Sequence, residues 1–461
     1  LETKMQENNN VHETWSSPLA FMLAAIGAAV GLGNIWRFPY VAGTNGGGAF
    51  VLVYIGFVVL LGIPIITAEL AMGRRGHHSP VVGMSDLARA EGHSQRWQII
   101  GWLSILIPLL GLTYYSIVAG WAVDYVFKSF AGEFSGVDGA GSGTLFNQLL
   151  ASPWSMIFWH TVYIGLTVWV VGKGVRHGLE TAVKIMMPAL FLILLFMVVY
   201  AMFVGDFMQG LDFLFDPDFS KLTVTGILMA MGQALFSMAI GVGAMITYGA
   251  YLPKSVSLPK VGIVIGAADT LVALFAGLAI FPLVLRYGLD PGEGPGLIFV
   301  TLPVAFGQMP GGALVGGLFF ILLTFAALTS SIGMLEPVVS WLEEHRGFKR
   351  PRMALLAGAA AWFVGLAIAL SFNVWGDVRL LGMFEFFKDK SIFDLMDFLV
   401  ANIMLPLNAL LIAVFAGWMM SRASTMDELG ITDGIRFRYW RFILRFAAPL
   451  AFGLIFVSNL V

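Results

Sequence analysis

The sequence contains no cysteine and few charged residues. Of its 461 residues only 12% are charged, about half of the ~25% that an average soluble protein carries. The lack of cysteine excludes disulfides and cysteine-based metal or redox sites, and the seven scattered histidines suggest no metal site. A net charge of −2 gives no reason to expect nucleic acid as a partner. By contrast, 58% of the residues are hydrophobic, and Phe (38) and Gly (54) are abundant. So few charges cannot cover a soluble domain of this size, and the composition predicts an all-α membrane protein.

Apolar segments long enough to cross a membrane fill nearly the whole chain. A membrane helix needs about 20 apolar residues, and on that rule we count about eleven spans. Their approximate limits are 18–42, 48–71, 98–127, 154–172, 179–204, 224–250, 260–286, 312–341, 353–372, 394–420 and 438–460. These segments leave no room for a soluble domain. We therefore expect a short segment at 1–17 followed by a single transmembrane domain at 18–461.

Basic residues predict the orientation of the chain. Cytoplasmic loops carry an excess of Lys and Arg, and here every second loop is basic, whereas the opposite loop 205–221 is acidic. The basic residues are Arg74, Arg75, Arg89, Arg96, Lys173, Arg176, Lys254, Lys260, Arg346, Lys349, Arg350, Arg352, Arg422, Arg436 and Arg438. We expect a cytoplasmic N-terminus and, with an odd number of spans, an extracellular C-terminus.

Glycines interrupt the first and the sixth spans. Three glycines fall within residues 27–33, and Gly232, Gly241 and Gly243 lie in the sixth span. Glycine weakens a helix, and these spans occupy matching places in two successive sets of five. Paired interrupted helices at matching positions indicate a transporter site built from inverted repeats. We find no repeat at the level of residues, so the repeat is inferred from placement alone.

An unwound segment in the first span would offer backbone groups for binding. Lipid cannot satisfy such groups, whereas free carbonyls suit a hard cation and free N–H groups suit a carboxylate. Asn34 adds a neutral oxygen to such a site. The alternative to a binding site is an ordinary helix that packs through its glycines and contains Asn34 incidentally. Arg37 in the same apolar stretch favours a functional site, because charge inside a membrane is costly.

Seven motifs resemble those of the neurotransmitter:sodium symporter family, in family order over nearly the whole chain. They are GAAVGLGNIWRFP (27–39), NGGGAF (45–50), GIPIITAELAMGR (62–74), Tyr114-Tyr115, GQALFSMAIGVGAMITYGAYL (232–252), FAALTSSIGMLEP (325–337) and Asp394-x-x-Asp397. The resemblance implies a LeuT-like 5+5 inverted-repeat bundle with helices 1 and 6 unwound at the centre. The repeat core would be 18–420 and the extra helix 438–460. Most members have a twelfth span, and its absence here favours the bacterial branch and hence a bacterial cell membrane.

The resemblance also implies two sodium ions. Ligands of the first would be the Ala29 carbonyl, Asn34, Ser237, Asp269 and the substrate carboxylate. Ligands of the second would be the carbonyls of Gly27, Val30 and Ala326 and the hydroxyls of Thr329 and Ser330. The alternative for the two hydroxyls is bonding to their own helix backbone. Chloride-dependent members carry a neutral Asn where this chain has Asp269, so we expect no chloride requirement, although Gln233 and Tyr54 match chloride-site neighbours. A helix-capping or water-facing Asp269 is the alternative.

The positions that match the family's substrate site are mostly small or apolar. They are Ala28, Ala29, Gly31, Leu32, Gly33, Gly111, Tyr115, Phe236, Ser237, Ala239, Val242, Ser330 and Met334. By the resemblance, Tyr115 would meet the substrate carboxylate and Phe236 would cover the substrate. Taken alone, Tyr115 could be an aromatic residue at the membrane interface, and Phe236 could be an ordinary packing side chain. An apolar pocket discriminates weakly, by about 1–3 kcal/mol per methylene, so we expect broad acceptance of aliphatic and aromatic L-amino acids.

Gates and a hinge complete the family pattern. Arg37 and Asp397 would form an extracellular ion pair. His12, Trp15, Tyr251 and Glu344 would form the cytoplasmic gate, with His12 where the family usually has Arg. Gly178 and Pro188 in the fifth span indicate a hinge or an ordinary proline kink, since proline removes a backbone hydrogen bond.

These features together predict a sodium-coupled importer of hydrophobic amino acids that works by alternating access. The alternative is a membrane receptor or sensor that binds an amino acid without transporting it. No paired catalytic carboxylates, nucleophile–base pair or nucleotide motif is visible in the sequence, so we expect neither an enzyme nor an ATP-driven pump. The expected partners are the substrate and the lipid bilayer, and no protein partner is implied.

Overall fold

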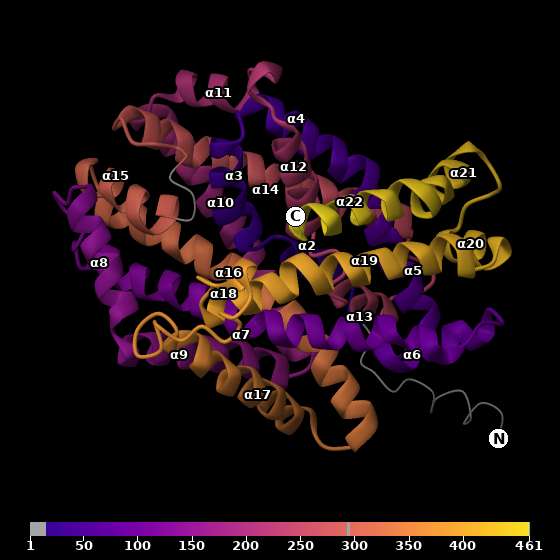
Figure 1. Cartoon of the computed structure of the whole chain (residues 1–461). Coiled ribbons are helices and arrows are strands. Elements are labelled where there is room, and N and C mark those ends of the chain that lie inside the picture. Colours follow the sequence, from indigo (N-terminus) through magenta and orange to yellow (C-terminus); the bar gives the residue numbers. More distant parts are fainter. Residues whose placement is uncertain (1–14, 293–295, 461) are drawn as a thin grey trace.

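The computed structural model describes residues 15–292 and 296–460. In these ranges every regular element is a helix, and the one β-type contact is an isolated bridge between Gly47 and Pro217. Long helices cross one another in a bundle, and shorter ones cap its ends (Figure 1). The prediction of an all-α fold is therefore confirmed.

Nine helical segments of the described chain are long and apolar enough to cross a membrane. They are Gly48–Gly76 (α4, η2, α5), Gln95–Phe130 (η3, α7), Pro153–Gly172 (α9), Val175–Val204 (η4, α10), Leu258–Arg286 (α14), Gly312–His345 (α16), Arg350–Leu370 (α17), Ile392–Met419 (α18, η8, α19, η9) and Ile435–Ser458 (α21, η10, α22). A bent pair, Pro18–Ala29 and Gly33–Thr44, makes a tenth span. The predicted span 224–250 is divided into two helices that are each too short to cross, so the total of eleven stays a prediction.

Shorter helices connect the spans. They are α6 (Pro80–Ala90), α8 (Gly139–Ala151), α11 (Phe207–Phe215), α15 (Leu302–Gln308) with η6 (Leu297–Thr301), and α20 (Arg422–Leu429). At the centre of the bundle α7 and α16 run against each other, and α2 packs against α10, α14 and α16. The first half of the interrupted first helix is therefore packed among continuous helices.

The first helix breaks directly after α2 (Pro18–Ala29). Ser17 caps its start by accepting a hydrogen bond from Ala20 N, and Pro18 fits the first helical position. Val30 is extended (φ −70°, ψ 110°), and the chain resumes as η1 (Gly33–Arg37) and α3 (Phe38–Thr44) at 48° to α2. The break leaves the last carbonyls of α2 without helical partners.

The sixth helix breaks between α12 (Val224–Ser237) and α13 (Ala244–Ala250). Three residues here have positive φ: Ala239 (52°), Gly241 (82°) and Gly243 (92°). Gly243 cannot be replaced without movement, because a Cβ there would lie 2.3 Å from the Ser104 Cβ. A left-handed alanine is strained, so packing fixes this break, with glycines lowering its cost.

Candidate functional site

A cavity of about 70 Å³ lies between the two helix breaks. All thirteen residues that the sequence assigns to the substrate site line it, together with residues that the sequence did not single out for the cavity: Ile107, Tyr114, Ala244, Gly333, Val400 and Leu405. Val400 and Leu405 come from the tenth span, which no substrate-site motif covers. Their contribution depends on how that span packs against α7, which only the fold reveals.

One end of the cavity is polar. The Tyr115 hydroxyl accepts a hydrogen bond from Leu32 N (3.3 Å), and Gly31 N donates to Asn34 Oδ1 (3.0 Å). A Cβ on Gly31 would lie 2.4 Å from Ser330 Oγ and 3.0 Å from the Tyr115 hydroxyl. Glycine is therefore needed for the backbone to approach these hydroxyls closely.

The opposite end is apolar and closely packed. A Cβ on Gly111 would lie 2.7 Å from Met334 Cε, the end of a flexible side chain that can change shape. Ala239 and Val242 add small apolar surfaces, and Val242 is buried. The cavity therefore combines a polar end of backbone and hydroxyl groups with an adaptable hydrophobic end.

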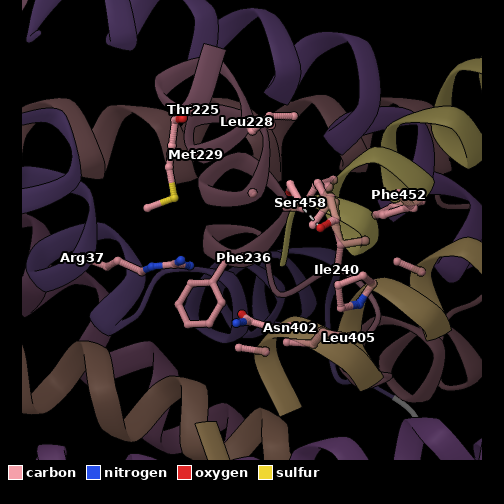
Figure 2. Close-up of a pocket in the computed structure, with 16 residues that line it drawn as sticks. Arg37, Thr225, Leu228, Met229, Phe236, Ile240, Asn402, Leu405, Phe452 and Ser458 are labelled. Carbon is pink, nitrogen blue, oxygen red and sulfur yellow. Dashed lines mark hydrogen bonds between the residues drawn. The ribbon is translucent and has the colours of Figure 1, made fainter. Parts of the chain in front are cut away.

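Phe236 separates this cavity from a larger outer pocket of about 210 Å³. The Arg37 guanidinium lies 4.4 Å from the centre of the Phe236 ring, and Figure 2 shows the two side chains facing each other, with Asn402 beside the ring. Phe452 and Ser458 from the last span line the pocket on the side away from Arg37. Phe236 and Leu405 line both spaces and thus form the wall between them, with Arg37 over the Phe236 ring on the outer side.

Asp269 is the centre of a buried polar cluster. Its carboxylate accepts hydrogen bonds from Asn34 Nδ2 (2.7 Å), Ser237 Oγ (2.9 Å) and the Tyr54 hydroxyl (3.2 Å). Asp269 is fully buried, and no ion pair to it occurs in the described ranges. An unpaired buried carboxylate is costly, so an oxygen-rich cluster of this kind fits a cation such as Na⁺.

A second cluster contains only neutral oxygens. Ser330 Oγ lies 3.2 Å from the Val30 carbonyl and 3.4 Å from that of Gly27, so it reaches across to the end of α2. Thr329 Oγ1 instead bonds within its own helix, to Ala326 O (3.0 Å) and Phe325 O (3.1 Å). The alternative of backbone bonding thus describes Thr329 here but not Ser330. These oxygens also suit a hard cation.

The expected outer gate pair stays a prediction. No ion pair joins Arg37 to Asp397 among the described residues. Arg37 lies over the Phe236 ring, and arginine side chains commonly stack on aromatic faces in this way.

Trp15 and Tyr251 of the expected inner gate lie together, and the gate as a whole stays a prediction. Trp15 donates to Tyr248 O (3.2 Å) and packs against Tyr251, with ring centres 6.2 Å apart. However, the Tyr251 hydroxyl donates to Glu336 (3.0 Å), whereas Glu344 accepts from Ser79 N (3.0 Å). His12 lies outside the described residues.

Sequence reasoning missed two acidic residues at this end of the bundle. Glu336 is fully buried and pairs with Arg350. Glu180 accepts a hydrogen bond from Ser16 N (2.6 Å) and pairs with Lys184 (3.0 Å). Both acids stand in apolar spans, and the rule that favoured a functional role for Arg37, that charge inside a membrane is costly, would also have found them.

The structure places Gly178 and Pro188 in one continuous span. Gly178 lies in η4 (Val175–Leu179), where a Cβ would lie 2.0 Å from Val170 O, and Pro188 lies inside α10 (Glu180–Val204). Because Glu180 holds Ser16, the start of the described chain is attached two residues beyond Gly178. The hinge stays a prediction.

Two interrupted helices around a central cavity are typical of a membrane transporter. The family model described as "Sodium:neurotransmitter symporter family" matches residues 12–138 and 146–461. The chain belongs to this family, and it is a multi-pass, sodium-coupled membrane symporter, not an enzyme.

Individual relatives agree with this assignment. The uncharacterized sodium-dependent transporter YhdH of Bacillus subtilis (strain 168) is 38% identical over 96% of this chain and 97% of its own length. An uncharacterized sodium-dependent transporter of Haemophilus influenzae is 33% identical over 99% and 100%. The crystal structure of MhsT in complex with L-phenylalanine matches with a TM-score of 0.88 at 39% identity, over 97% of this chain and all of that one. The predicted LeuT-like fold and family are therefore confirmed.

Proposed function

We propose that this chain imports hydrophobic L-amino acids, aliphatic and aromatic, together with two sodium ions by alternating access. The cavity carries the proposal, because its polar end matches an amino-acid backbone and its apolar end matches a hydrophobic side chain. The similarity to MhsT, which was solved with L-phenylalanine, supports the same substrate class.

The substrate carboxylate is proposed to sit at the break in the first helix. Backbone N–H groups near Gly31 and Gly33 and the Tyr115 hydroxyl would donate to it, since free N–H groups at a helix break favour an anion. Phe236 would close the cavity from the outer pocket. The hydrophobic side chain would then lie toward Gly111 and Met334.

Sodium is proposed to bind at the two oxygen clusters. The first ion would take Ala29 O, Asn34, Ser237 and Asp269 and touch the substrate carboxylate, which couples ion and substrate binding. The second would take Gly27, Val30, Ala326, Thr329 and Ser330, and it would join the first helix to α16. Because Asp269 already supplies a negative charge, no chloride is required.

The proposal includes the setting of the protein. We place it in the bacterial plasma membrane with a cytoplasmic N-terminus and an extracellular C-terminus, following the basic loops. Residues 1–17 would be a cytoplasmic segment and 18–461 one transporter domain.

Uptake by purified protein in proteoliposomes tests the proposal. We expect labelled Phe, Leu and Trp to accumulate only with an inward sodium gradient, and not when the gradient is collapsed or choline replaces sodium. Sodium-dependent binding without accumulation would instead support a receptor. Accumulation of polar but not hydrophobic amino acids would contradict the proposed substrate class.

Gly111→Val tests which end of the cavity holds the side chain. Extra volume at the apolar end should weaken Trp and Phe much more than Ala, by about 1–3 kcal/mol. Gly165→Val is the matched control, because nothing lies within 4 Å of a Cβ at Gly165. Equal losses for all substrates would show that Gly111 does not face the side chain.

A further inference from the structure

Glu69 is a buried acid without a cation. It lies in α5 (Ile63–Gly76), is fully buried, and accepts one hydrogen bond, from Gly241 N to its Oε1 (2.7 Å). Its other oxygen, Oε2, has no hydrogen-bond partner among residues 15–292 and 296–460. An ionised carboxylate at this depth would need a counter-charge or several donors, and Glu69 has one donor.

Asn408 contacts Gly241, the residue that donates to Glu69. It lies in α19 (Leu405–Val414), and its Nδ2 donates to Gly241 O (2.7 Å) and to Ser104 Oγ (3.2 Å). Its Oδ1, like Glu69 Oε2, is buried and has no partner. Two orphan acceptors therefore flank Gly241, which stands with φ +82° in the break of the sixth helix.

Charged groups on the elements packed against α5 all lie elsewhere. These elements are η2 (Val58–Gly62), α6, α13, α14, α19, α20 and η10 (Ile443–Ala447); η2 and α19 contain no titratable residue. Some of the other elements' titratable groups form ion pairs of their own: Asp86 with Arg89, Arg422 with Asp433, Asp427 with Arg75 and Lys254, and Glu428 with Arg74. Three make other contacts: Tyr248 packs against Trp15, Asp269 lies in its own polar cluster, and Arg445 donates to Gly417 O. Lys260 is exposed, and Arg286 lies at the far end of α14. None of these groups forms an ion pair or hydrogen bond with Glu69.

We propose that Glu69 is a proton-binding site of the transport cycle. Its carboxyl group holds a proton on Oε2 while the break in the sixth helix is closed around Gly241. A proton there removes the buried charge and turns one of the two orphan acceptors into a donor. When the break opens and water enters, the O–H bond breaks, the proton passes to water, and the electron pair stays on the carboxylate.

The consequence is that a proton exchanges with solvent in addition to sodium. The proposal does not depend on which substrate the cavity accepts, because neither Glu69 nor Asn408 lines it. It predicts that acid favours the closed break and alkali favours the open one, since the ionised form is stable only where water reaches it.

Infrared spectroscopy of the purified protein in lipid tests the protonation directly. We expect the parent at neutral pH to show a carboxylic-acid carbonyl band that shifts in D₂O and is lost in Glu69→Gln. Glu336→Gln is the matched control, because Glu336 is equally buried but paired with Arg350 and should contribute no such band. A band that is unchanged in Glu69→Gln would come from another acid and would overturn the proposal. This result is expected if Glu69 is ionised and a water molecule bridges it to Asn408.

Thiol labelling tests the link to the helix break, and the absence of native cysteine gives a clean background. Thr247→Cys places a probe in α13, at a fully buried position beyond the break. The measured quantity is the labelling rate of Thr247→Cys divided by that of Asp212→Cys, an exposed reference position. This ratio should increase as pH rises when Glu69 is present, and it should be independent of pH when Glu69→Gln is added. Glutamine keeps an acceptor for Gly241 N and replaces O–H by N–H, so it mimics the protonated acid. Identical pH profiles with and without Glu69→Gln would overturn the proposal.

Asn408→Leu provides a second route if Glu69→Gln does not fold. Removing the neighbouring amide changes the surroundings of the Glu69 carboxyl and should move its carbonyl band. A band that stays in place in Asn408→Leu would assign the signal to another acid and contradict the proposal.

Discussion

The two oxygen clusters beside the cavity differ by one charge. The first contains the Asp269 carboxylate with Asn34 and Ser237, whereas the second contains only carbonyls and hydroxyls from the end of α2 and from α16. A cation at the first would be neutralised by a fixed charge. A cation at the second would depend on geometry and on the negative end of the α2 helix dipole.

If both clusters bind sodium as proposed, this difference gives two ways of binding the same ion. The first cluster would attract a cation in any conformation that keeps Asp269 buried, because the charge is part of the chain. The second would require α2 and α16 to approach each other, since Ser330 and the carbonyls of Gly27 and Val30 belong to different helices. The charged site should dominate affinity, and the neutral site should report whether the two helices are together.

Asp269→Asn should have the largest effect, because it removes the charge that distinguishes the clusters. A charge pair about 4 Å apart interacts by about 4 kcal/mol at an effective dielectric of 20, so the sodium affinity should fall ~100- to 1000-fold. Sodium titration of uptake measures the loss. The exposed Asp212→Asn serves as control, and an unchanged half-saturation in Asp269→Asn would remove Asp269 from the sodium site.

Thr329→Ala combined with Ser330→Ala should have the next largest effect. Two neutral ligands are lost at about 0.5–1.5 kcal/mol each, which predicts sodium-dependent uptake reduced by ~5- to 150-fold with normal insertion into the membrane. Ser331→Ala is the control, since Ser331 bonds Tyr163 (2.6 Å) and not α2. If the double variant keeps its sodium dependence, the second cluster does not bind sodium.

Tyr54→Phe should have a smaller effect on the charged cluster. It removes one of several hydrogen bonds to Asp269, a change of about 1 kcal/mol or ~5-fold in sodium affinity. The second cluster should not be affected. Tyr163→Phe is a suitable comparison, because the Tyr163 hydroxyl bonds Ser331 and not Asp269. A loss as large as that of Asp269→Asn would mean that Tyr54 itself contacts the ion.

Replacing chloride by gluconate should have no effect on the parent. A second anion about 4 Å from Asp269 would be repelled by about 4 kcal/mol at the same effective dielectric. In Asp269→Asn, chloride should partly restore uptake, because the repulsion is gone. Loss of uptake by the parent in gluconate would show that Asp269 does not replace chloride.

Much of the architecture could be predicted from local sequence. Apolar length set the spans, and the glycines at 27–33 and 241–243 marked both breaks, because these properties depend on a residue and its near neighbours. The family resemblance assigned thirteen residues to the substrate site, and the structure brings all of them to one cavity.

Only the tertiary structure decided which partners the polar side chains have. The sequence did not single out Glu336, to which the Tyr251 hydroxyl donates, two helical turns before Glu344 on the same helix. It did not predict that Arg37 lies over the Phe236 ring. It could not show that Ala239 takes φ 52°, since alanine has no local preference for that conformation. Each outcome depends on contacts between segments far apart in the chain, whose distances are fixed only when the helices pack.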